Sequence, residues 1–193
     1  MSEHTKLVSQ SSFYHICALR QICGVLDPST AAAIASALIS SGLNYANSVL
    51  FGSPAKNITR LQRVQNAAAR ILAQKPSYLF SFDTLWELHW LPIQWRIKFK
   101  LASLTFKATH NEVPPYLSRL LIPYCPSSVL RSSLSSNLLQ VFCTNLVFGS
   151  HLFRAAATTV WNSPPKSVRS SNTLNAFWRH VKTHYFQAAF NTP

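Results

Sequence analysis

Residues 57–74 read NITRLQRVQNAAARILAQ, the most clearly helical pattern in this chain of 193 residues. With about 100° of rotation per residue, one broad face of the predicted helix is apolar. This face carries Ile58, Leu61, Val64, Ala68, Ile71 and Leu72. An adjacent narrow stripe is basic and carries Lys56, Arg60, Arg63 and Arg70. No acidic residue lies on this helix, so the stripe is either a phosphate-binding surface or the solvated face of a basic protein.

Helical periodicity continues on the N-terminal side of this stretch, in residues 12–26 and 31–50. Between these two segments, Asp27 and Pro28 form a helix start signal, because Asp can cap a helix and Pro suits its first turn. In the second of these helices, Ser41 and Gly42 mark the candidate position of a kink.

Residues 93–110 predict a second long helix with two apolar rows. The rows are Trp95, Phe99, Ala102 and Phe106, and Ile97, Leu101, Leu104 and Ala108. A helix that is apolar on two faces is expected to be wedged between neighbours. Three basic residues, Arg96, Lys100 and Lys107, line the gap between the rows and join the candidate basic surface.

Shorter helical segments fill much of the remaining chain. Residues 82–90 and 116–121 predict helical turns, and residues 150–161 predict a helix. A last helix is expected to end at Ala188, with Ser171 or Asn172 as its N-cap.

We therefore expect a mainly α fold, an irregular bundle of five or six helices, with a small β-hairpin as an option near residues 138–148. The length suits about one domain. The expected parts are a flexible N-terminus, a helical region, a Ser/Pro-rich loop with the hairpin, and a C-terminal helical segment. Their bounds are 1–11, 12–122, 123–149 and 150–190.

The charge balance indicates the class of partner. The chain holds 18 Lys and Arg against 5 Asp and Glu, a formal charge of +13. Such an excess favours a polyanion, nucleic acid before an anionic membrane surface. Residues 28–55 carry no charge and could span a bilayer, but their many Ser and Asn residues favour a buried helix pair. The N-terminus lacks a segment of signal-peptide type, so we expect an intracellular protein, in the nucleus or the cytoplasm, with no membrane partner.

Catalysis is not expected from this composition. Metal-dependent polymerases and nucleases need several converging carboxylates, whereas the two Asp residues here lie more than fifty positions apart. The chain has no glycine-rich phosphate loop and no G-x-S-x-G nucleophile motif. We expect no enzyme activity, no cofactor and no small-molecule substrate.

No metal site is expected either. The chain has no C-x-x-C motif, so its four cysteines are interpreted as reduced thiols of the core. They are Cys17, Cys23, Cys125 and Cys143. His180 and His184 are four residues apart, but Arg179 and Lys182 beside them oppose a metal ion.

The five tryptophans allow two interpretations. Trp86, Trp90, Trp95, Trp161 and Trp178 could stack on nucleic-acid bases. At helical spacing beside Leu and Phe, however, such rings more often belong to the core, which is the interpretation we favour.

Several strings resemble one protein family, and they occur in that family's order. They are SGLNYANSVL at 41–50, LQRVQNAAAR at 61–70, LHWLPI at 88–93 with RIKFK at 96–100, LTFKA at 104–108 with PPYL at 114–117, LRSS at 130–133, VWNSPP at 160–165 and FWRHVKTHYF at 177–186. The chain resembles, over residues 12–190, the C-terminal region of the reverse-transcriptase polyprotein of non-LTR retrotransposons (LINE elements of the chicken-repeat-1, LINE-2 and jockey-like type).

The resemblance implies a thumb-like, post-polymerase helical region for residues 12–122. It implies a fragment of an RNA-directed DNA polymerase that lacks both the endonuclease and the catalytic aspartates of the palm. Our leading hypothesis is a truncated, non-catalytic protein that contacts the RNA or DNA backbone independently of sequence. The alternative is a structural or interaction module that self-associates through apolar helix faces, or an open reading frame with no evolved activity.

Overall fold

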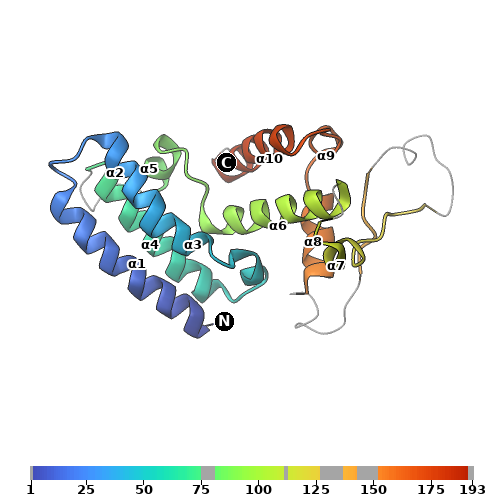
Figure 1. Cartoon of the computed structure of the whole chain (residues 1–193), viewed down its shortest axis with the longest axis horizontal. Coiled ribbons are helices and arrows are strands. Elements are labelled where there is room, and N and C mark those ends of the chain that lie inside the picture. The colour runs from blue at the N-terminus through green and yellow to red at the C-terminus, as the bar shows by residue number, and fades with distance from the viewer. Residues whose placement is uncertain (1, 75–80, 111–112, 127–136, 143–151, 191–193) are drawn as a thin grey trace. The chain divides into compact units, whose positions relative to one another are not determined.

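The computed structural model describes residues 2–74, 81–110, 113–126, 137–142 and 152–190 (Figure 1). These residues are mainly helical and contain no β-strand, so the predicted mainly α fold is confirmed. The chain divides into two compact units, Met1–Arg96 and Ile97–Pro193, where its length suggested one domain.

Unit 1 is built from helices that pack side by side. They are α1 (Ser2–Ile22), α2 (Pro28–Ala35), α3 (Ser41–Asn44), α4 (Ala55–Leu72) and α5 (Ser81–Glu87), with a π-helical turn at Ser36–Ser40 and a 3₁₀ turn at Asn47–Leu50. Helix α1 packs along α4, and α2 contacts both of them (Figure 1). A long helix, α6 (Ile93–His110), begins in unit 1 and continues into unit 2.

The N-terminal residues belong to helix α1, although we expected residues 1–11 to be flexible and the helix to begin near residue 12. The reason lies in small hydroxyl side chains, because Thr5, Ser9 and Ser12 are buried along α1. The hydroxyl of Thr5 lies 3.3 Å from the side-chain oxygen of Asn57 on α4. A seam of small polar residues lets two helices pack closely, but it leaves no apolar periodicity for sequence analysis to detect.

The segment after Asp27 is helical but not continuous. Asp27 caps α2 as expected, accepting a hydrogen bond from the backbone N–H of Thr30 at 2.9 Å. Hydrogen bonds from Ser29, which have the largest effect, and from Thr30 hold the pKa of the Asp27 carboxyl below its usual range. Before Gly42 the chain winds through the π-helical turn, and Ala46 then adopts a φ of 50°, in the left-handed region. The single helix predicted to Leu50 is therefore wrong.

The corner between α5 and α6 is held by side chains from α4. Gln65, which is fully buried, donates from Nε2 to the carbonyl oxygen of Leu91 at 2.8 Å. The Oε1 atom of Gln62 accepts a hydrogen bond from the backbone N–H of Ile93 at 2.9 Å. These two bonds fix the chain at the first residue of α6.

Unit 2 surrounds a core of aromatic rings. Its further helices are α7 (Pro115–Ser118), α8 (Phe153–Asn162), α9 (Lys166–Arg169) and α10 (Leu174–Phe190). Phe106 of α6 lies 4.5 Å from Phe177 of α10, ring centre to ring centre, and 6.4 Å from Trp161 of α8. The N-cap of α10 is Thr173, whose hydroxyl accepts a hydrogen bond from Ala176, and not Ser171 or Asn172.

The segment 137–142 is attached to the end of α8. The side chain of Asn162 makes two hydrogen bonds to the backbone of Leu139, accepting from its N–H at 3.0 Å and donating to its carbonyl oxygen at 2.8 Å. Trp161 donates from Nε1 to the carbonyl oxygen of Asn137 at 2.8 Å. Leu139 also forms an isolated antiparallel bridge with Pro123, so its segment pairs with the beginning of the Ser/Pro-rich part, 123–149. The rest of the predicted hairpin, 143–148, lies outside the described residues.

We expect Asn162→Ala to lower the free energy of unfolding by about 1–3 kcal/mol, because two backbone groups of the buried Leu139 lose their partners. Urea unfolding followed by circular dichroism measures the change. Asn175→Ala, at an exposed position of α10, is the matched control and should leave stability nearly unchanged. Equal effects of the two substitutions would contradict the role given to Asn162.

Candidate nucleic-acid interface

Helix α4 carries the predicted basic stripe on its surface. Lys56 and Arg63 are exposed, whereas Arg60 and Arg70 are half-buried. Arg60 donates to the carbonyl oxygen of Ser2 on α1 at 3.4 Å, and Arg70 donates from Nε to that of Asn66 at 3.2 Å. These contacts orient two of the four side chains.

Lys56 and Arg63 are the most accessible members of this stripe. Within the described part of the chain, neither has a hydrogen-bond or ion-pair partner. Every charged residue of α4 is basic, so the helix itself offers no carboxylate to either of them. Both cations are therefore available to an external anion.

Arg96 has a different environment from the other predicted residues. It donates from Nε to the carbonyl oxygen of Leu91 at 2.9 Å, and its guanidinium carbon lies 5.6 Å from the centre of the Trp90 ring. Burial lowers the pKa of Arg96 to about 10. The guanidinium of Arg96 therefore interacts within unit 1, where it stabilises the corner that precedes α6.

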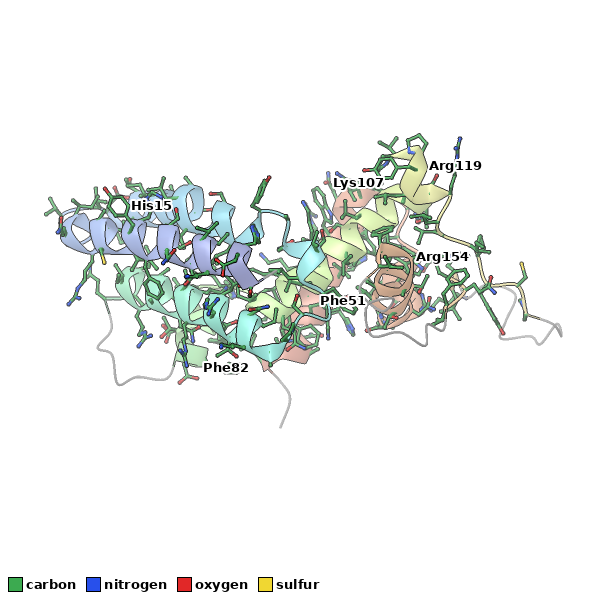
Figure 2. The ribbon with its side chains drawn as sticks, turned by 90° about the horizontal axis from the view of Figure 1, so that it is seen from below. His15, Phe51, Phe82, Lys107, Arg119 and Arg154 are labelled. Atoms are coloured by element: carbon green, nitrogen blue, oxygen red, sulfur yellow. The ribbon has the colours of Figure 1, made fainter. Side chains whose placement is uncertain are left out.

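Lys100 and Lys107 belong to unit 2, so the seven predicted residues divide between two units. Lys100 is exposed, and Lys107 is half-buried. The Nζ atom of Lys107 lies 5.8 Å from the centre of the Trp178 ring on α10. Figure 2 labels Lys107 on α6, together with Arg119 after α7 and Arg154 on α8.

Sequence analysis missed the concentration of charge in unit 2. This unit holds ten Lys and Arg but a single acid, Glu112, whereas unit 1 holds eight against four. Glu112 lies outside the described residues, so every described charged side chain of unit 2 is basic. Counting the two halves of the sequence separately would have revealed this asymmetry.

Sequence analysis favoured a core location for all five tryptophans. This is wrong for Trp86, which is 52% exposed, and for Trp178. In the structure 36% of its surface is exposed. Its neighbours on α10, Arg179 and Lys182, are exposed as well. The string FWRHVK at 177–182 is the signal that could have shown an aromatic ring among cations.

Other kinds of site find less support. Cys17, Cys23 and Cys125 are free thiols, but only Cys23 is buried, so the core location predicted for the other two is wrong; Cys143 lies outside the described residues. In the described ranges no three His, Cys, Asp or Glu side chains gather in a way that could hold a metal ion. None of the described helices combines the length and the apolar character needed to cross a membrane.

No family model, no curated protein and no solved structure matches this chain. The resemblance to retrotransposon reverse transcriptases therefore depends on the sequence strings, and the candidate interface depends on its own geometry and charge.

We expect Arg96→Lys to lower the free energy of unfolding by about 1–2 kcal/mol, although the charge is kept, because lysine cannot reproduce the planar contact with Trp90 or the Nε hydrogen bond. Lys100→Arg, at an exposed position on the same side of α6, should have no measurable effect. Thermal unfolding checks both variants, and a neutral result for Arg96→Lys would mean that the corner does not depend on the guanidinium.

Proposed function

We propose that this chain binds the phosphate backbone of RNA or DNA, independently of sequence and without catalysing a reaction. The observation that carries the proposal is the surface of α4, where Lys56 and Arg63 are exposed and no acidic residue is present. Lysine and arginine that neutralise phosphates release condensed counterions, which supplies most of the affinity of non-specific binding.

Two basic surfaces contribute in this proposal, one on each unit. The first comprises Lys56, Arg60, Arg63 and Arg70 on α4, and the second is formed around Lys100 and Lys107 on α6. Arg96 is left out, because its guanidinium already bonds Leu91 and faces Trp90. The sequence strings favour an origin as an accessory C-terminal part of a non-LTR reverse transcriptase, a context in which such binding is useful.

The salt dependence of binding tests the proposal. We expect the full chain to bind a labelled single-stranded RNA, with an affinity that falls steeply as salt rises. The double variant Lys56→Gln with Arg63→Gln should reduce the slope of log affinity against log salt by about 1 to 2 units. Fluorescence anisotropy at a series of salt concentrations measures both quantities.

The matched control is Lys6→Gln with Arg20→Gln, which removes the same charge from exposed positions of α1. This control should change the slope much less, because α1 is not part of the proposed surface. Equal slopes for the two double variants would contradict a specific role of α4, and no binding by the unmodified chain would overturn the proposed function itself.

A second candidate function is self-association through α1. This helix exposes Leu7, Tyr14 and Ile22, which lie seven and eight residues apart and therefore on one side of the helix. Unpaired apolar side chains on one helix face are typical of surfaces that another protein covers.

If α1 is an interface, the mass of the protein should rise with concentration, and Leu7→Gln with Tyr14→Gln should keep it at the monomer value. Size-exclusion chromatography with light scattering measures the mass. The control pair is Tyr116→Gln with Leu120→Gln, which alters exposed apolar residues of unit 2. A monomer at every concentration would exclude this second candidate.

A further inference from the structure

Trp178 is held at the surface by the packing of its neighbour. Phe177 is buried in the aromatic cluster of unit 2, with its ring centre 5.6 Å from that of Trp161. Successive residues of a helix point about 100° apart. Because Phe177 faces the core, Trp178 lies at the boundary between the buried and the exposed face of α10. The indole of Trp178 is therefore fixed in place and partly exposed, at 36%.

Cations surround this indole. Lys107 of α6 places its Nζ atom 5.8 Å from the ring centre. Lys182 lies four residues after Trp178 on the same side of α10, and Arg179 is adjacent in sequence; both are exposed. Helix α10 returns alongside α6 in the opposite direction, which brings the two basic helices together (Figure 1).

The exposed Trp86 provides a contrast within the same chain. It is 52% exposed, more than Trp178, but its helix α5 carries Asp83 and Glu87 on either side of it. An indole between carboxylates repels a phosphate chain, whereas one among lysines attracts it. Exposure alone therefore does not distinguish these two tryptophans, but their charged neighbours do.

We propose that Trp178 is a stacking platform for one base of a single-stranded nucleic acid, with Lys107 and Lys182 contacting the flanking phosphates. This inference rests on the proposed function, and it adds the class of nucleic acid and the site where a base is held. A single strand is required because a base can reach the ring only when it is not stacked within a duplex. Every base has a π-face, so the platform tolerates any sequence.

Two oligonucleotides with the same phosphates separate stacking from backbone binding. One is a ten-residue oligo-dT, and the other is an abasic strand of equal length. We expect the unmodified full chain to bind oligo-dT about fivefold or more tightly than the abasic strand. Trp178→Leu should remove most of this preference, and Trp86→Leu, the matched control, should keep it. All three proteins should share one salt slope, because their charges are the same.

A second variant guards against a loss of folding in Trp178→Leu. Trp178→Phe keeps an aromatic ring, so it should fold and retain most of the preference for oligo-dT. It lacks the indole emission, so oligo-dT should quench the fluorescence of Trp178→Phe less than that of the unmodified chain or of Trp86→Phe.

The outcomes are distinguishable. If Trp178→Leu keeps the full preference for oligo-dT, or if Trp178→Phe is quenched as strongly as the unmodified chain, the platform is overturned while backbone binding stands. If the unmodified chain binds neither strand, the proposed function fails, and this inference fails with it.

Discussion

The carbonyl oxygen of Leu91 accepts hydrogen bonds from two side chains, Gln65 of α4 and Arg96 of α6. Together with the bond between Gln62 and the N–H of Ile93, they determine where α6 begins. Gln65 and Ile93 are fully buried, so an unpaired amide there would cost about 1–3 kcal/mol. Helix α6 provides much of the core of unit 2. The first turn of this helix is held by polar contacts within unit 1.

Unit 2 has a corresponding attachment at the end of α8. Asn162 bonds both backbone groups of Leu139, and its own carbonyl oxygen accepts a hydrogen bond from Arg169 at 3.1 Å. Gln62, Gln65 and Leu91 lie in the strings LQRVQNAAAR and LHWLPI, and Asn162 lies in VWNSPP, which are among the strings on which the proposed resemblance rests. Their polar residues hold irregular segments in place, a structural role that is independent of any binding activity.

Apolar periodicity was sufficient to predict the long helices. The bounds of α6 agree with the expected range, and α4 differs from it by two residues at each end. Apolar periodicity did not predict the start of α1, because the buried residues there, Thr5 and Ser9, are small hydroxyl residues with little apolar signal. It also could not show that Gln65 is buried or that Arg96 is held by Leu91, since both depend on a corner between segments far apart in sequence. For the same reason, Trp178 was interpreted as a core residue although its exposure depends on how Phe177 packs.

The shortage of acid changes how this protein accommodates its cations. A buried or half-buried cation is often paired with a carboxylate, but three of the described cations contact carbonyl oxygens or aromatic rings. Arg169 bonds the carbonyl oxygen of Asn162, Arg154 lies over the ring of Phe142, and Lys107 lies over that of Trp178. Burial lowers the pKa of Arg169, yet an arginine stays protonated at neutral pH. Carbonyl oxygens and aromatic rings orient a cation without cancelling its charge, so these three side chains stay positively charged. The same contacts that stabilise the fold thus leave these cations charged for the polyanion binding proposed above.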